Sequence, residues 1–97
     1  MFVVSLTYKK DLSEVDQHID AHVQYLEKYY AEKVFIASGR KVPRTGGVIL
    51  ANAPSLEALN VVLKEDPFYI AELADYEVTE FIPSMAADGF EFLKNFQ

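Results

Sequence analysis

The chain has 97 residues, with fifteen acidic and nine basic side chains and a formal net charge of −6. This length predicts a single domain over residues 1–97, and the acidic balance argues against nucleic acid and anionic membrane surfaces, which are bound by basic faces. Cysteine is absent, which excludes disulfides and thiolate metal sites, and neither a signal-peptide pattern nor an apolar run near ~20 residues occurs, so a cytoplasmic protein is expected.

The first strand is predicted over residues 2–8, a short apolar run rich in β-branched and aromatic side chains. One long amphipathic helix is predicted over residues 13–30, with Ser13 as its N-cap and Asp16 as the acid that reaches back to that cap. Apolar positions recur in it at three- and four-residue spacing, so they share one face. This apolar stripe consists of Val15, Ile19, His22, Val23, Leu26 and Tyr30.

Two further strands are predicted over residues 34–38 and 48–53. Residues 39–47 connect them and read as a loop, because they contain three glycines and a proline. The close succession of the two strands predicts an antiparallel hairpin with a long tip.

Ser55 is the expected N-cap of a second helix, which ends at Asp66 because the next residue is a proline. A fourth strand is predicted over residues 76–82. Residues 85–96 form a terminal segment with aromatic and aliphatic side chains at helical spacing, which predicts an extra C-terminal helix.

The predicted order βαββαβ indicates an α+β, ferredoxin-like fold, with a four-stranded antiparallel sheet and two helices on one face. The other face of such a sheet is open in a monomer. Hydrophobic residues make up 51% of the chain, which is more apolar surface than a small monomer can hide. We therefore predict a homodimer through the sheet face, or a higher oligomer.

His22 is the first candidate for chemistry, since a histidine can gain or lose a proton near neutral pH and serve as a general acid or base. The alternative is a satisfied histidine between helix and sheet. Asp66 is its candidate partner, although an aspartate at this place is also a good N-cap for the turn that Pro67 begins. Both roles are compatible if one carboxylate oxygen caps the turn and the other holds His22. His18 and His22 are four residues apart, but the HExxH acid is missing, so no metal is predicted.

The loop over residues 39–47 is the second candidate. Its glycines would let the backbone approach a ligand, and Arg40, Lys41 or Arg44 could hold a carboxylate or an enolate. The alternative is a solvated hairpin tip. The phosphate-binding pattern GxxxxGK[ST] is absent from this loop.

Three segments resemble the YCII-related (YciI-like) family. They are His22 followed by Tyr25-Leu26, the run ASGxxxPRTGG over residues 37–47, and Asp66-Pro67-Phe68. The resemblance implies a dimeric α+β barrel and a cleft lined by a histidine and an aspartate, here His22 and Asp66, with Ser38 and the glycine loop nearby. Some relatives are dehydrochlorinases of aromatic-ring breakdown, in which that pair is the acid–base element.

The leading hypothesis is a small lyase or isomerase that needs no cofactor. His22 would move a proton on a small anionic substrate, Asp66 would orient His22, and Arg40 or Arg44 would hold the anion. The other predicted binding residues are Ser38, Gly39 and Gly46. The main rival is a non-enzymatic ligand-binding or interaction module, which would be favoured if His22 and Asp66 did not meet in an open pocket. An oxygenase-like barrel is a third hypothesis.

Overall fold

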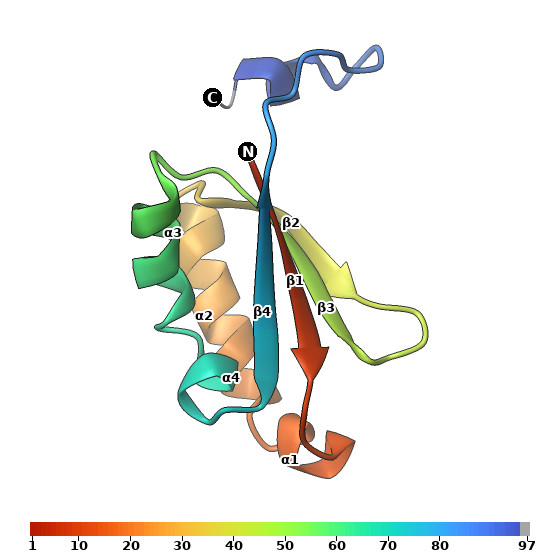
Figure 1. Ribbon diagram of the computed structural model, residues 1–97, viewed down its shortest axis with the longest axis vertical. Coiled ribbons are helices and arrows are strands. Elements are labelled where there is room, and N and C mark those ends of the chain that lie inside the picture. The colour runs from red at the N-terminus through yellow and green to blue at the C-terminus, as the bar shows by residue number, and fades with distance from the viewer. Residues whose placement is uncertain (96–97) are drawn as a thin grey trace.

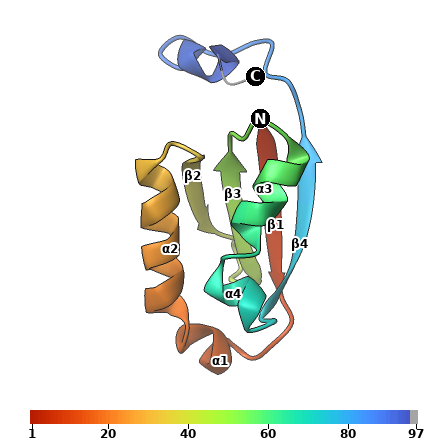
Figure 2. The ribbon, with the colours of Figure 1, turned by 90° about the vertical axis from the view of Figure 1, so that its left-hand side faces the viewer.

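A computed structural model of the chain describes residues 1–95 and confirms the predicted α+β fold. Four antiparallel strands form a sheet in the order β2-β3-β1-β4, and the helices lie on one face of it (Figures 1 and 2). This is the ferredoxin-like arrangement. The strands are β1 (Phe2–Tyr8), β2 (Phe35–Arg40), β3 (Gly46–Ala51) and β4 (Ala74–Glu80). The helices are α1 (Leu12–Asp16), α2 (Ile19–Ala31), α3 (Leu56–Leu63), α4 (Pro67–Ile70) and the 3₁₀ helix η1 (Glu91–Asn95).

The centre of the sheet is β1, which pairs with β3 on one side and β4 on the other. Its alternate side chains Phe2, Val4 and Leu6 are buried against the helices, as the two-residue period of a strand requires. They form the core with Ile49 of β3 and with apolar side chains of α2, α3 and α4. No helix of the described residues is long and apolar enough to cross a membrane.

The single helix predicted over residues 13–30 is wrong, because the chain forms two helices that meet at Gln17 and His18. In a continuous helix the Glu14 carbonyl would accept the amide of His18. Instead the His18 ring nitrogen Nδ1 bonds that carbonyl at 3.1 Å, and the His18 amide donates to Val15 at 3.0 Å. The histidine side chain thus replaces one backbone bond of the ladder and allows the chain to change direction.

This break also moves the buried face of the helix. Tyr25 and Tyr29 are the buried residues of α2, whereas Val23, expected in the stripe, is 42% exposed. The predicted caps shift as well: Ser13 lies inside α1, and Asp11 is the N-cap residue without a side-chain bond.

The hairpin is tighter than predicted, since β2 extends to Arg40 and β3 begins at Gly46. The tip is therefore residues 41–45 only. A Cβ atom on Gly46 would lie 1.7 Å from the Leu6 carbonyl oxygen, so glycine is what allows β3 to approach β1 here. The lack of a side chain at Gly46 therefore allows the two strands to pair closely. The sequence had suggested instead that this glycine lets the backbone approach a ligand.

The predicted N-cap Ser55 is confirmed, because its side chain accepts the amide of Ala58 at 3.1 Å. The helix ends at Leu63, earlier than predicted, and Asp66 caps the separate helix α4. The predicted C-terminal helix is present only as η1, beyond the end of β4 (Figure 1). Phe96, part of the predicted terminal pattern, lies outside the described residues.

Candidate active site

A cavity of about 390 Å³ lies between α2, the sheet and the start of α4. The predicted site residues that line it are His22, Ser38, Gly39, Arg40, Arg44 and Gly46. Asp66 and Lys41 do not line it, and Nζ of Lys41 donates to the Thr7 hydroxyl at 3.1 Å. Its apolar walls are Leu6, Ile19, Leu26, Val48, Ile49 and Phe68. Helix α2 supplies the histidine, and the β2–β3 hairpin supplies the basic and glycine residues, so the cavity joins segments that are distant in the sequence.

Asp66 lies behind His22 and is completely buried. Its oxygen Oδ1 accepts the His22 ring nitrogen Nδ1 at 2.8 Å and the Phe68 amide at 2.9 Å. Its second oxygen, Oδ2, accepts the Tyr76 hydroxyl at 2.6 Å. The expectation that one oxygen caps the turn and the other holds His22 is therefore wrong: the same oxygen does both, and Tyr76 occupies the other.

This contact assigns the proton on the imidazole of His22. A carboxylate only accepts hydrogen bonds, so Nδ1 carries hydrogen, and in the neutral ring the other nitrogen, Nε2, has a free lone pair. His22 is 13% exposed and lines the cavity, and within residues 1–95 no hydrogen bond occupies Nε2. The arrangement can therefore accept a proton from a bound molecule.

Phe68 fixes the plane of the His22 ring. The two rings stack with centroids 3.9 Å apart and planes 2° apart. Phe68 is one wall of the cavity without filling it, and Tyr25 is not among the lining residues. His22 and Asp66 thus meet beside an open pocket, so the arrangement that would favour a binding module, with the two residues apart, is not the one observed.

Two charged residues that line the cavity, Arg44 and Asp16, pair with each other. Nη2 of Arg44 lies 2.5 Å from Oδ1 of Asp16, and this hydrogen bond raises the pKa of Arg44. The role predicted for Asp16 as a capping acid is therefore wrong. Arg40 also lines the cavity, and the hydroxyl groups of Ser38 and Tyr30 are bonded to each other.

Two tyrosines beside the buried carboxylate keep their protons. Burial raises the pKa of Tyr25 and of Tyr76, and the nearby charge of Asp66 raises both further. The Tyr25 hydroxyl donates to the Val62 carbonyl at 2.9 Å and so ties α2 to α3. Sequence patterns did not assign Tyr76 or Phe68 to the site, although Phe68 belongs to the Asp-Pro-Phe run that carries the family resemblance.

The two histidines do not share a ligand position. His18 bonds the Glu14 carbonyl and His22 bonds Asp66. Across residues 1–95 there is no group of three or more histidine, cysteine or acidic side chains that could hold a metal ion.

Fold and site together define a ferredoxin-like α+β protein with a histidine–aspartate contact beside a cavity. The chain belongs to the YCII-related domain family, whose model matches residues 1–82, and this confirms the resemblance inferred from the sequence. No curated protein matches the chain.

Several solved structures share this fold, and one of them is similar to the chain at low sequence identity. It is the 5-chloro-2-hydroxyhydroquinone dehydrochlorinase TftG from Burkholderia phenoliruptrix AC1100, in complex with 2,5-dihydroxybenzoquinone. The superposition has a TM-score of 0.72 at 21% identity and covers 82% of this chain and 91% of that chain.

Proposed function

We propose that this protein is a small lyase or isomerase that needs no cofactor and transfers a proton on a small anionic ring compound. The observation that carries the proposal is the 2.8 Å contact between His22 Nδ1 and Asp66 Oδ1, with His22 lining the cavity. The fold that the chain shares with a dehydrochlorinase is compatible with this chemistry.

In the proposed reaction, His22 Nε2 takes a proton from a carbon atom next to a carbonyl group of the substrate, and the C–H electrons form an enolate with its negative charge on the carbonyl oxygen. The imidazolium that forms is stabilised by Asp66, which accepts the hydrogen bond from Nδ1 throughout. The enolate electrons then form a C=C bond and expel an anionic leaving group from the neighbouring carbon atom, or His22 returns the proton to another ring carbon. Arg40 would stabilise the negative charge on that oxygen.

The apolar walls fit a flat ring, because Leu6, Ile49 and Phe68 face the same cavity as the polar residues. A volume of about 390 Å³ is at the small end of ligand cavities. These features favour a single-ring substrate with acidic or phenolic groups. The predicted homodimer and the cytoplasmic location remain predictions alongside this function.

The test is a screen of chlorinated and hydroxylated ring compounds for chloride release and for uptake of solvent deuterium. We expect wild-type turnover on at least one compound and a loss of about 10²–10⁴-fold in His22→Gln, since a general base contributes that much. Glu27→Gln is the matched control, because Glu27 lies on the same helix α2, is exposed and does not line the cavity.

Binding of ring anions with no deuterium uptake would instead support the ligand-binding module. Equal turnover in wild type and His22→Gln would show that the chemistry does not use His22.

A further inference from the structure

We propose that Tyr76 is a positioning residue that holds the Asp66 carboxylate and, through it, the His22 ring in the orientation that transfers the proton. The inference rests on the proposed acid–base role of His22. It adds a residue from β4, whose hydroxyl group donates to Asp66 at 2.6 Å.

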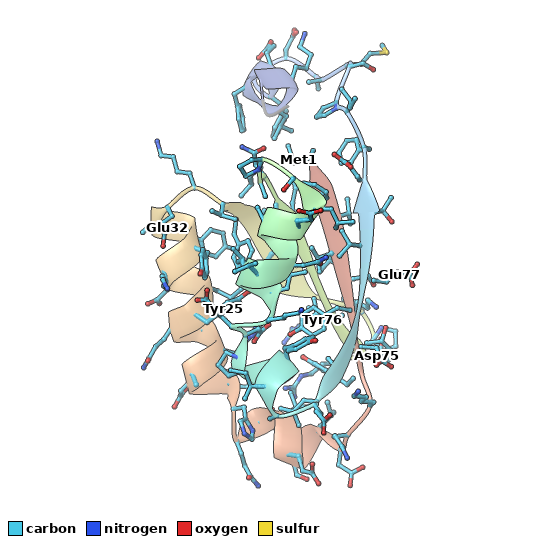
Figure 3. All side chains as sticks on the ribbon, turned by 60° about the vertical axis from the view of Figure 1, so that its left-hand side comes forward. Met1, Tyr25, Glu32, Asp75, Tyr76 and Glu77 are labelled. Atoms are coloured by element: carbon cyan, nitrogen blue, oxygen red, sulfur yellow. The ribbon has the colours of Figure 1, made fainter. Side chains whose placement is uncertain are left out.

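The sheet places Tyr76 rigidly. It pairs with Leu6 of the central strand β1, and Leu6 lines the cavity, so both side chains are on the helix side of the sheet. Figure 3 shows Tyr76 directed toward the helices, while its neighbours Asp75 and Glu77 point away from them. The Tyr76 ring also packs edge-to-face on Tyr69, with centroids 5.6 Å apart.

The hydrogen bonds of Asp66 explain why one hydroxyl group matters. Oδ1 accepts from both His22 and Phe68, whereas within residues 1–95 Oδ2 accepts from Tyr76 alone. A carboxylate bonded at both oxygens cannot rotate about its Cβ–Cγ bond without breaking a contact. Without the Tyr76 hydroxyl, Oδ2 would be a buried charged acceptor with no donor, which is costly, and the carboxylate would turn to recover one.

The direction of donation is also fixed. The Tyr76 hydroxyl remains protonated because burial and the Asp66 charge raise its pKa, so it donates to the carboxylate. Asp66 then remains an acceptor for the Nδ1 hydrogen of His22, and Nε2 is left as the proton acceptor at the cavity. Tyr76 does not line the cavity itself, so it acts through Asp66 without touching substrate.

The first experiment records the ¹⁵N spectrum of the His22 imidazole, which reports the tautomer directly. In wild type with a neutral His22 ring we expect one tautomer, with hydrogen on Nδ1. In Tyr76→Phe we expect both tautomers, and exchange of the Nδ1 hydrogen with solvent about tenfold faster or more, as the loss of one hydrogen bond to a charged group implies. Tyr69→Phe is the matched control, since it removes a hydroxyl from the packed partner ring and leaves the bonds of Asp66 in place; it should match wild type.

A second measurement needs no substitution and covers the case in which Tyr76→Phe fails to fold. Tyrosine labelled with ¹³C at Cζ, in equal parts of H₂O and D₂O, gives a resolved pair of signals only when the hydroxyl exchanges slowly. Tyr76 should give such a pair. A single averaged signal, or a Tyr76→Phe spectrum of His22 identical to wild type, would overturn the proposal.

Neither measurement needs a substrate, so the result is independent of the turnover screen. A fixed tautomer that depends on Tyr76, together with a failed screen, would count against the proposed reaction but not against the positioning role. Once a substrate is known, Tyr76→Phe should lower kcat with KM nearly unchanged, because the hydroxyl does not touch the substrate.

Discussion

The Asp66 carboxylate accepts three donors: the ring of His22, the backbone amide of Phe68 and the hydroxyl of Tyr76. Asparagine and serine cap helices about as well as aspartate, so capping alone does not require an acid at this position. The three donors together do require an acid here, because only an ionised carboxylate offers enough acceptor sites without bringing a donor of its own. One set of hydrogen bonds therefore lets Asp66 both cap helix α4 and hold the His22 ring.

Asp16 limits what Arg44 can bind. The two side chains form an ion pair at the cavity, so an anionic ligand must compete with Asp16 for the guanidinium group. We predict that Asp16→Asn frees Arg44 and tightens the binding of benzoate, a small ring carboxylate, by about three- to tenfold. Calorimetric or NMR titration would measure the change.

The control for this prediction is Asp20→Asn, which changes the net charge by the same amount. Asp20 is exposed and does not line the cavity, so its substitution should leave benzoate affinity close to that of wild type. An equal gain in both variants would show that net charge, and not Arg44, controls the binding.

The candidate pair His22 and Asp66 could be proposed from the sequence because each residue has a local signal: a histidine in an apolar stripe, and an aspartate before a proline. The pairing of Asp16 with Arg44 had no such signal. It depends on where α1 ends and on how short the hairpin tip is, and the sequence patterns gave neither correctly. The role of Tyr76 likewise depends on strand register, which alternation alone does not determine.

At the level of elements, the β-strands and their order along the chain could be predicted because apolar runs separated by polar, glycine and proline residues mark them. The break between α1 and α2 could not be predicted, since the apolar spacing in the sequence continues through it. One side-chain bond from His18 to the Glu14 carbonyl interrupts the helix, and periodicity does not detect such a bond. The break matters for the site, because it places Asp16 at a helix end beside the cavity.

Two glycines of the hairpin allow a matched test of the contact between β3 and β1. A Cβ atom at Gly46 would overlap the Leu6 carbonyl oxygen, whereas one at Gly39 would meet nothing within 4 Å. We predict that Gly46→Ala lowers the free energy of unfolding by more than about 2 kcal/mol, because backbone atoms must move apart. Gly39→Ala should change it by less than about 0.5 kcal/mol. Denaturant unfolding of both variants would measure the difference, and similar losses would refute the assignment of Gly46 to sheet packing.

The junction between α2 and the segment after α3 depends on pH. The Tyr29 hydroxyl donates to Oε1 of Glu65 at 2.7 Å, and Nζ of Lys28 lies 3.3 Å from the same oxygen. The hydrogen bond from Tyr29, followed by that from Lys28, lowers the pKa of Glu65 below its ordinary value of 4.5. A lowered pKa in the folded state means that the stabilisation is complete above the ordinary value and is lost as the pH falls through the lowered one.

We therefore predict that Glu65→Gln is less stable than wild type near neutral pH and that the difference shrinks as the pH falls below 4.5, the ordinary pKa of Glu65. Thermal unfolding of both proteins from neutral to acidic pH would test it. Tyr29→Phe, which removes the hydroxyl that donates to Glu65, should reproduce part of the loss. Parallel stability curves for wild type and Glu65→Gln at all pH values would contradict the prediction.

On the scale of the whole molecule, the feature to explain is the face of the sheet that lies opposite the helices. Strand register places Val3, Val48 and Leu50 together on the side opposite the buried Val4 and Ile49. Among residues 1–95, no helix covers that side (Figures 1 and 2). The segment after β4 adds exposed apolar side chains, with Ile82 at 71% and Met85 at 89% exposure. Apolar side chains left exposed in this way favour an interaction with a partner.

We predict that a second copy of the chain covers this face, so that wild type sediments as a dimer at micromolar concentration. Leu50→Lys would place a charge in the predicted contact and should weaken the dimer at least about tenfold, because an unpaired ammonium group is costly to bury. Val61→Lys is the matched control: Val61 is 65% exposed on α3, on the helix side of the sheet, so a lysine there should leave the dimer intact. A monomeric wild type, or equal weakening by both substitutions, would show that the sheet face does not form the interface. If Leu50→Lys gives a folded monomer with the His22 tautomer of wild type, the contact between His22 and Asp66 does not depend on the dimer.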